Sequence, residues 1–294
     1  MLKIDLLKIR INQSKIEIPL NIIGIDIGQS LTKIAYLEGD NLYLNLILTK
    51  PNFEEIIKFL DLKKRFYKKF NFTGGKAFNL YNKYSKEVET KLYNEFQANI
   101  KGIETLFLLN KEIAVPDSLI ITIGTGTSII LKKKSFKHLG GTALGGGLFM
   151  GLIKLLFNFN DFQEAMKLST IGDRYNVDLK VSDIYEPEDD RVNSIFREFT
   201  AASFGKINDN FTMNSVQKED IISSLINMIG ENVGIIACQM AETNDIINLI
   251  FCGGFLRNNK VLKKMLSLLC KVNNKKAIFL RNSEFCGAIG ALLI

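Results

Sequence analysis

The stretch Ile22-Ile-Gly-Ile-Asp-Ile-Gly-Gln-Ser-Leu-Thr-Lys33 decides the fold class of this 294-residue chain. Residues 22–27 are a short apolar run rich in β-branched side chains, which predicts a buried strand with Asp26 near its end. The turn Gly28-Gln29-Ser30 then leads directly into a second apolar run over 31–37. Two strands joined in this way form a hairpin, whereas a dinucleotide-binding Rossmann unit passes from strand through turn into a helix.

The same arrangement occurs again further along the chain. The run Leu119-Ile-Ile-Thr-Ile123, the turn Gly124-Thr125-Gly126 and a second run over 127–132 again have the order strand, turn, strand. This internal duplication predicts two similar lobes with a nucleotide between them, because the backbone N–H groups of each turn can bind phosphate. The order of elements is mixed α/β throughout, and no Pro- or Ser-rich linker interrupts it.

The remaining elements follow from apolar periodicity. Strands are expected near 42–48 and over 247–252 and 276–280, and helices over 54–69, 77–91, 97–110, 148–157, 217–241, 258–271 and 283–293. Five glycines between 140 and 147 favour a loop where backbone approaches a ligand at a helix N-terminus, with a purely structural loop as the alternative. The long helix over 217–241 can span a lobe or form a subunit interface. The first twenty residues are expected to add a strand or a docked extension.

Composition excludes several kinds of chemistry. The chain is 47% hydrophobic and 23% charged, which indicates a globular protein with a large core. It has one histidine, His138, so a multi-histidine metal centre is impossible. Its four cysteines form no CxxC pair, which argues against zinc and thioredoxin-type redox sites. They lie in apolar stretches, which predicts buried, reduced thiols and a cytoplasmic location.

The net charge of +7 favours anionic ligands such as nucleotides. The most basic stretch, 58–70, has the apolar spacing of an amphipathic helix, so we expect a solvated face there and no nucleic-acid partner. No apolar run reaches the length of a membrane span, and the N-terminus lacks the apolar core of a signal peptide. We therefore expect no membrane contact.

These motifs together resemble those of type II (eukaryotic-like) pantothenate kinases, which belong to the actin/hexokinase/Hsp70 ATPase superfamily. Four segments carry the resemblance: Gly24-Ile-Asp-Ile-Gly-Gln-Ser-Leu-Thr-Lys33, Ile123-Gly-Thr-Gly-Thr-Ser128, His138-Leu-Gly-Gly-Thr-Ala-Leu-Gly-Gly-Gly147 and Gly172-Asp-Arg-Tyr-Asn-Val-Asp-Leu-Lys-Val-Ser-Asp-Ile-Tyr185. It implies an α/β, two-lobed actin-like ATPase (ribonuclease H-like) fold in which each lobe is a mixed sheet flanked by helices. The implied domains are an N-terminal extension (1–21), an N-terminal lobe (22–115) and a C-terminal lobe with dimerisation helices (116–294).

The resemblance further implies an enzyme that phosphorylates the terminal hydroxyl of pantothenate with ATP and Mg2+, the first step toward coenzyme A. It implies a cytoplasmic homodimer that coenzyme A or acyl-CoA can inhibit. The matching catalytic positions are Glu95, Lys33 and His138, the substrate-binding positions are Thr125, Ser128, Glu95 and His138, and the metal position is Asp26. The matching ATP-binding positions are Asp26, Gly28, Gln29, Ser30, Lys33, Gly124, Gly126, Gly145, Gly146, Gly147, Gly253 and Gly254.

Three residues depart from the family pattern. Gln29 replaces a glycine, with a penalty of roughly 1–2 kcal/mol if that position needs a positive φ. Gln97 replaces an aspartate, and His138 replaces an arginine whose bidentate fork an imidazole cannot form. Two hypotheses follow: a functioning pantothenate kinase, or a catalytically impaired paralogue that binds nucleotide or acyl-CoA as a regulatory or structural subunit. A kinase acting on a related pantothenate-like substrate is a third.

Overall fold

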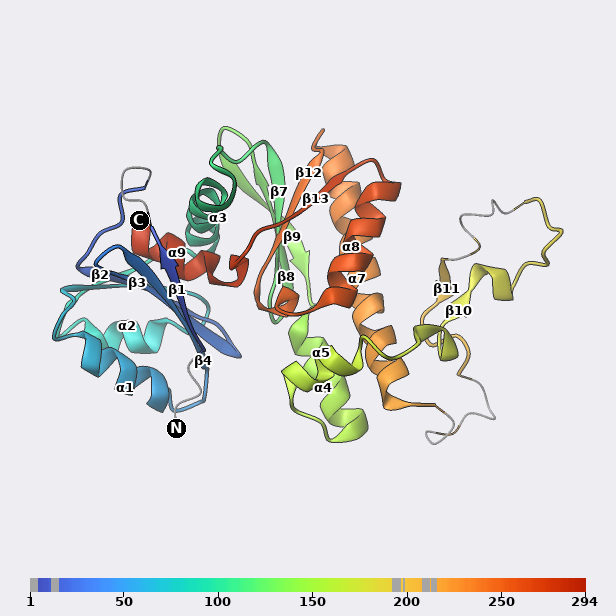
Figure 1. Cartoon of the computed structure of the whole chain (residues 1–294), viewed down its shortest axis with the longest axis horizontal. Helices are drawn as coiled ribbons and strands as arrows, with labels where there is room; N and C mark the ends of the chain where they lie inside the picture. Colours follow the sequence, from blue (N-terminus) through green and yellow to red (C-terminus); the bar gives the residue numbers. More distant parts are fainter. Residues whose placement is uncertain (1–4, 12–15, 192–196, 198, 208–211, 213–215) are drawn as a thin grey trace.

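The computed structural model describes residues 5–11, 16–191, 197, 199–207, 212 and 216–294 (Figure 1). The chain folds into two mixed β-sheets with helices between them and on their outer faces. This arrangement confirms the expected fold class. Part of the N-terminal extension, residues 1–4 and 12–15, lies outside the described residues. The boundaries proposed between extension and lobes stay predictions.

The two sheets repeat one topology. The first has the order β1-β4-β3-β2-β5-β6, and the second has the order β13-β12-β7-β8-β9. In each sheet an antiparallel hairpin is followed by a third antiparallel strand, and two parallel strands lie on the other side. The strands are β1 (Asp5–Arg10), β2 (Ile22–Ile27), β3 (Leu31–Glu38), β4 (Asn41–Leu48), β5 (Lys69–Thr73), β6 (Glu89–Leu92), β7 (Ser118–Ile123), β8 (Thr127–Lys132), β9 (Phe136–Thr142), β12 (Asn248–Cys252) and β13 (Lys276–Phe279). The predicted duplication is therefore confirmed, and β1 is the extra strand expected of the extension.

Helices form three layers around the sheets, as Figure 1 shows. Helices α1 and α2 cover the outer face of the first sheet, and α7 and α8 cover the outer face of the second, while α4 and α5 pack in the α7 core beyond the lower end of that sheet in Figure 1. Helices α3 and α9 lie between the sheets and share one core with both. The helices are α1 (Glu54–Lys63), α2 (Phe78–Tyr84), α3 (Glu95–Lys111), α4 (Gly146–Phe157), α5 (Phe162–Leu168), α7 (Lys218–Thr243), α8 (Lys260–Val272) and α9 (Cys286–Leu293).

Two predicted helices are too long, and three strands of the two large sheets, β5, β6 and β9, were not predicted. The helices expected over 54–69 and 77–91 end at Lys63 and Tyr84, because the residues that follow join the first sheet as β5 and β6. Pairing of β5 with β2 and of β6 with β5 overrides the local helical spacing there. The interpretation of Gly140 and Gly141 as loop residues is also wrong, since both lie in β9. A Cβ at residue 141 would overlap the carbonyl oxygen of Thr127, so the strand can approach β8 only with glycine there.

By length and composition alone, helix α7 could cross a membrane. However, 72% of its most apolar 18-residue window is buried inside the chain. Gly230 and Gly234 let side chains of α8 pack closely against it, with Met265 and Leu269 in contact range. The helix therefore spans the second lobe as a core element, which was one of the two predicted roles.

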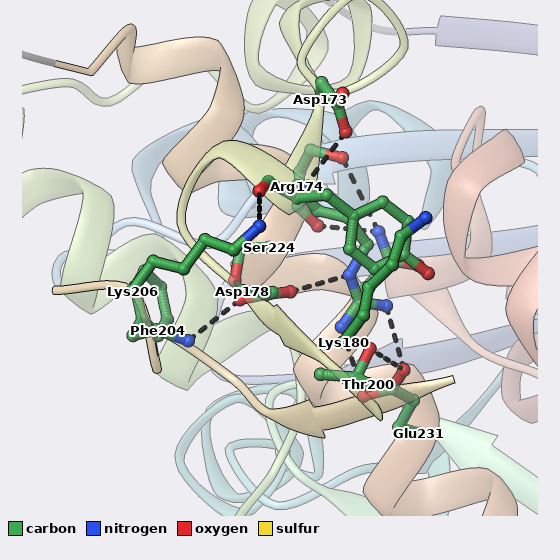
Figure 2. A network of polar contacts seen from close by, with 12 residues as sticks. Asp173, Arg174, Asp178, Lys180, Thr200, Phe204, Lys206, Ser224 and Glu231 are labelled. Atoms are coloured by element: carbon green, nitrogen blue, oxygen red, sulfur yellow. Dashed lines mark hydrogen bonds and ion pairs between the residues drawn. The ribbon is translucent and has the colours of Figure 1, made fainter. Parts of the chain in front are cut away.

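A buried ion network fixes the Gly172–Tyr185 segment to α7 (Figure 2). Arg174 is 6% exposed, and its Nε donates a 2.6 Å hydrogen bond to Asp178. Its two terminal nitrogens donate to both carboxylate oxygens of Glu231 on α7, at 2.8 and 3.2 Å. Thr200, in the short ladder of β10 (Leu179–Lys180) and β11 (Thr200–Ala202), donates to the same carboxylate. The segment Gly172–Tyr185 thus has a structural role at this point, because a buried charge needs such partners.

Backbone-to-backbone contact holds α3, α9 and β2 together. A Cβ at Gly290 of α9 would overlap the carbonyl oxygen of Ala98 on α3. A Cβ at Gly102 of α3 would overlap the carbonyl oxygen of Cys286, and one at Gly24 of β2 would overlap that of Ala288. The three elements can approach this closely only because these positions carry no side chain.

We expect Gly290→Ala to lower the free energy of unfolding by about 1–3 kcal/mol, because the added methyl forces α9 away from α3. Gly151→Ala is the matched control, since Gly151 is also inside a helix but a Cβ there meets no atom within 4 Å. That change should raise the free energy of unfolding by about 0.5–1 kcal/mol, the usual effect inside a helix. Urea unfolding measures both, and shifts of the same sign would contradict the packing described.

Candidate active site

The first hairpin carries a buried ion pair. Asp26 on β2 and Lys33 on β3 are direct cross-strand partners, and Lys33 Nζ lies 3.1 Å from Asp26 Oδ2. Their side chains are only 10% and 14% exposed. Burial alone would lower the pKa of Lys33, but the charge and hydrogen bond of Asp26, with the charge of Glu95, outweigh burial and raise it. Lys33 is therefore a stable cation at the end of the strand.

Glu95 is the first residue of α3 and faces this ion pair. The side chain of Asn94 caps the helix by accepting hydrogen bonds from the backbone N–H groups of Phe96 and Gln97, at 2.9 and 3.3 Å. Glu95 is accessible to solvent, yet the surrounding protein removes much of the water from its carboxylate. This desolvation raises its pKa, the charge of Asp26 raises it further, and Lys33 opposes both.

Two buried thiols lie close to the same ion pair. The Cys286 thiol, at the start of α9, donates to Asn99 Oδ1 at 3.1 Å, and Cys252 Sγ lies 3.2 Å from the hydroxyl of Thr122. The hydrogen bond with Cys252 and burial hold the pKa of Cys286 well above its usual range. All four cysteines are free and buried, as predicted. No local pattern indicates that two of them meet beside the ion pair, because Cys252 ends β12 and Cys286 begins α9.

The second hairpin carries hydroxyl groups where the first carries charges. Thr122 and Ser128 are cross-strand partners in β7 and β8, in the positions that correspond to Asp26 and Lys33. Ser128 Oγ is buried and has no hydrogen-bond partner among the described residues. A buried hydroxyl without a partner is costly, so it marks a position where a ligand can supply the missing hydrogen bond. Thr125 lies apart from it, exposed at the tip of the turn.

The glycine-rich loop packs on the second turn. The backbone N–H groups of Gly146 and Gly147 donate to the carbonyl oxygens of Gly124 and Thr125, at 2.8 and 2.9 Å. A Cβ at Gly147 would lie 2.6 Å from Cγ2 of Thr125, and one at Gly145 would lie 2.7 Å from its carbonyl oxygen. These three glycines therefore serve close packing at the start of α4. The first two N–H groups of α4 are therefore already bound to protein carbonyl oxygens.

The last glycine pair connects the two hairpins. Gly253 has φ 104°, and a Cβ there would overlap the carbonyl oxygen of Ile123 at the end of β7. Only glycine fits this turn. A Cβ at the next residue, Gly254, would lie 3.4 Å from Leu31 in the first hairpin. The structure thus brings the turns after β2, β7 and β12 to one place, as expected of the ATP-binding positions.

The first turn shows no strain at Gln29. Residue 29 is exposed and is not among the non-glycine residues with positive φ, so the penalty considered from the sequence is absent. The turn closes through a 3.1 Å hydrogen bond from the N–H of Gly28 to the carbonyl oxygen of Leu31, which needs no left-handed residue between them. Ser30 is exposed and accepts a backbone hydrogen bond from Thr49 at 2.9 Å.

The other two departures lie at the first turn of α3, which Glu95 begins. Gln97 is exposed in the first turn of α3. The imidazole of His138 on β9 stacks on the ring of Phe96, with 4.3 Å between ring centroids and 14° between planes. The structure therefore places His138 against the residue that follows Glu95. Sequence reasoning did not identify Phe96, since nothing local marks a stacking partner on another element.

The carboxylates of Asp26 and Glu95 suit Mg2+. Within the described ranges, no group of three or more His, Cys, Asp or Glu side chains could hold a metal by itself. Asp26 lies close enough to Glu95 for its charge to raise the pKa of Glu95. Gly74 leaves room for the Asp26 carboxylate, because a Cβ there would lie 2.5 Å from Asp26 Oδ1. Mg2+ is held by one or two carboxylates, waters and substrate phosphates, and so fits this donor set.

Comparison with known proteins gives a family. The Fumble family model matches residues 45–294. A type II pantothenate kinase of Bacillus anthracis is 38% identical over 275 residues, which cover 92% of this chain and 96% of that protein. A type II pantothenate kinase of Oceanobacillus iheyensis is 36% identical over 278 residues, which cover 92% and 98%.

Solved structures confirm the fold. The activator of 2-hydroxyisocaproyl-CoA dehydratase from Clostridium difficile, with bound ADPNP, has a TM-score of 0.59 at 18% identity and covers 92% of each chain. A ROK family glucokinase from Streptomyces griseus, in complex with glucose and AMPPNP, has a TM-score of 0.55 at 13% identity, and the match covers 92% of this chain and 97% of that one. At such identities the similarity concerns the actin/hexokinase-like fold alone.

The charges around Glu95 predict two opposite changes of its pKa. Lys33→Met removes the cation that lowers this pKa and should raise it further, whereas Asp26→Asn removes the anion that raises it and should lower it. Carbon-13 NMR titration of glutamate-labelled protein measures both, with Glu95→Gln to assign the signal. Lys132→Met is the control, since Lys132 pairs with Glu104 further along α3 and should leave the titration unchanged. Shifts of the reverse sign would contradict the described geometry.

Proposed function

Since the chain belongs to the Fumble family of type II pantothenate kinases and phosphorylates pantothenate with ATP, we propose that Glu95 is the catalytic base of this reaction. The product is 4'-phosphopantothenate. The observation that carries the proposal is the position of Glu95, at a capped helix start beside the Asp26–Lys33 pair. A carboxylate with a raised pKa is a stronger base than an ordinary one, and it is ionised above that pKa.

Each charged group has one task in this reaction. The ionised Glu95 accepts the proton of the pantothenate hydroxyl as its oxygen bonds to the γ-phosphorus and the bond to ADP breaks. Lys33, held in its charged form by Asp26, neutralises negative charge on the phosphoryl oxygens. Phosphoryl transfer depends mainly on such positioning and charge neutralisation, so no covalent enzyme intermediate is needed.

The ATP phosphates are assigned to the turns. Those backbone N–H groups of the turns around Gly28, Gly124 and Gly126 and of the first turn of α4 that do not already donate to carbonyl oxygens would bind them, with adenosine beside Gly253 and Gly254. The shared location of these turns supports the assignment, as does the binding of ATP analogues by proteins of the same fold. Asp26 would hold Mg2+, directly or through water. The ion supplies further neutralisation of phosphate charge when bound.

Pantothenate is assigned to the hydroxyl side of the second hairpin. Ser128 supports this, because its buried hydroxyl lacks a partner in the described part of the chain. Thr125 and His138 complete the proposed contacts. The retained Asp26, Lys33 and Glu95 constellation favours an active kinase over an impaired paralogue.

The remaining expectations concern partners and location. A homodimer is supported by the family resemblance, and a cytoplasmic location by four free, buried thiols. Inhibition by coenzyme A or acyl-CoA is supported by the family resemblance. Lysines of the basic stretch 58–70 are ion-paired, for example Lys63 with Glu38 and Lys64 with Glu87, which supports a solvated face over a nucleic-acid site.

Glu95→Gln should lower the rate of 4'-phosphopantothenate formation by about 100-fold or more, because the amide cannot accept the proton. Affinity for ATP should stay within a few-fold of wild type, since the turns and Lys33 are unchanged. Glu104→Gln, on the same helix but outside the site, is the matched control and should keep full activity. A Glu95→Gln protein with wild-type turnover would refute the proposed base.

A further inference from the structure

Four connections lie at the end of the second sheet that is opposite to the candidate active site. Strands β7, β12 and β13 are parallel and begin at this end, and the antiparallel strands β8 and β9 are joined there. Helices α3, α7 and α8 end at the same place, because each leads into one of the parallel strands. The turns assigned to ATP follow the other ends of β7 and β12, so this surface faces away from them, at the upper end of the sheet in Figure 1. We call it the sheet-end surface; its residues are 111–117, 132–137, 244–248 and 271–276.

Each of the four connections exposes one large apolar side chain. Ile113, between α3 and β7, is 56% exposed, and Phe136, beside the β8–β9 turn, is 48% exposed. Ile247, between α7 and β12, is 62% exposed, and Val272, at the end of α8, is 42% exposed. A single exposed apolar side chain is ordinary on a protein surface, but four at one end of one sheet indicate a surface that contacts something apolar.

Lysines surround these apolar side chains. They are Lys111, Lys132, Lys133, Lys134, Lys137, Lys271, Lys275 and Lys276. Lys132 pairs with Glu104 at 3.6 Å, and Lys275 pairs with Glu242. The other six form no ion pair with a residue that the structure describes. The surface carries fewer further carboxylates, namely Glu112, Asp117 and Asp245, and is therefore positively charged.

Helix ends account for only some of these lysines. Lys111 and Lys271 lie in the last turns of α3 and α8, where a cation interacts favourably with the helix dipole. Lys133, Lys134 and Lys137 lie in or beside the β8–β9 turn, which follows no helix. Their charges have no such structural role.

An anionic and partly apolar surface complements the sheet-end surface. Lysine ammonium groups bind lipid phosphates as point charges, and exposed apolar side chains can enter the boundary between headgroups and acyl chains. A second copy of the chain would instead bring like charges together. The sheet-end surface carries no arginine, whose planar fork is typical of nucleic-acid contacts.

We propose that the sheet-end surface binds the anionic face of a lipid bilayer, with the β8–β9 turn as the main contact. The expectation of no membrane contact rests on the lack of an apolar run long enough to span a bilayer, which binding to a lipid surface does not require. The cytoplasmic leaflet of a membrane carries anionic lipids, so the partner suits the proposed location. Bound in this way, the chain keeps its catalytic turns open to solvent, and the proposal does not depend on the kinase reaction.

Sedimentation of the purified protein with lipid vesicles tests the proposal. Vesicles of phosphatidylcholine and phosphatidylglycerol in equal amounts supply the anionic surface, and vesicles of phosphatidylcholine alone are the neutral comparison. We expect binding to the mixed vesicles at about 50 mM NaCl, binding about tenfold weaker to the neutral vesicles, and loss of binding at about 500 mM NaCl, because salt screens the charges. Equal binding to both kinds of vesicle, or none to the mixed vesicles, would overturn the proposal.

Substitutions in and beside the β8–β9 turn test the assigned contact. The triple variant Lys133→Gln, Lys134→Gln, Lys137→Gln should lower the partition coefficient onto mixed vesicles by about 100-fold, since each lysine near an anionic surface contributes about fivefold. Phe136→Ser should lower it by about tenfold, because the variant lacks the apolar side chain that enters the lipid interface.

A second triple variant separates the local surface from net charge. Lys58→Gln, Lys64→Gln, Lys68→Gln removes the same charge from the basic stretch 58–70 of the first lobe and should change the partition coefficient by less than about threefold. Equal losses in the two triple variants would overturn the assigned surface, because net charge alone would then explain the binding. A single-stranded oligonucleotide that binds more tightly than the mixed vesicles and displaces them would make a nucleic acid the occupant and would also overturn the proposal. All these variants should form 4'-phosphopantothenate at the wild-type rate, since the substituted residues lie outside the candidate active site.

Discussion

Direct backbone contact among β2, α3 and α9 is the constraint on which the site depends. Asp26 ends β2, Glu95 begins α3, and Cys286 begins α9, so the spacing of these elements sets the spacing of the reactive groups. Glycines at the crossing points allow that spacing, and a Cβ at Gly287 would already lie 2.8 Å from Asp26 Oδ2. The site is therefore formed jointly by the first hairpin and by the last helix of the chain, which pack against each other.

Duplication of the hairpin unit then divides the chemistry between two sheets. The positions that carry a carboxylate and an ammonium in the first hairpin carry two hydroxyls, Thr122 and Ser128, in the second. Both hairpins have a glycine-containing turn. The proposed function assigns phosphoryl transfer to the charged hairpin and pantothenate to the neutral one, with Glu95 at the start of α3, which lies between the two sheets.

Local sequence patterns predict the elements whose structure depends mainly on residues close in the sequence. Apolar β-branched runs with glycine turns predicted both hairpins, and the residues assigned to the nucleotide do meet at one place. The errors arose where distant pairing decides the outcome. Lys69–Thr73 becomes a strand because β2 lies beside it, and Gly140 and Gly141 fit a strand as well as a loop. The Phe96–His138 stack depends on register between elements, for which a single sequence carries no signal.

Sequence similarity to pantothenate kinases indicates pantothenate as the acceptor of the phosphoryl group, whereas the similarity to a glucokinase concerns the fold alone and makes glucose a suitable comparison substrate. Phosphorus-31 NMR of the purified protein with Mg-ATP and equal amounts of pantothenate and glucose distinguishes them most directly. The site described here predicts that a 4'-phosphopantothenate signal grows as the γ-phosphate signal of ATP declines, with no sugar phosphate. Formation of glucose phosphate, or an unchanged spectrum, would contradict it.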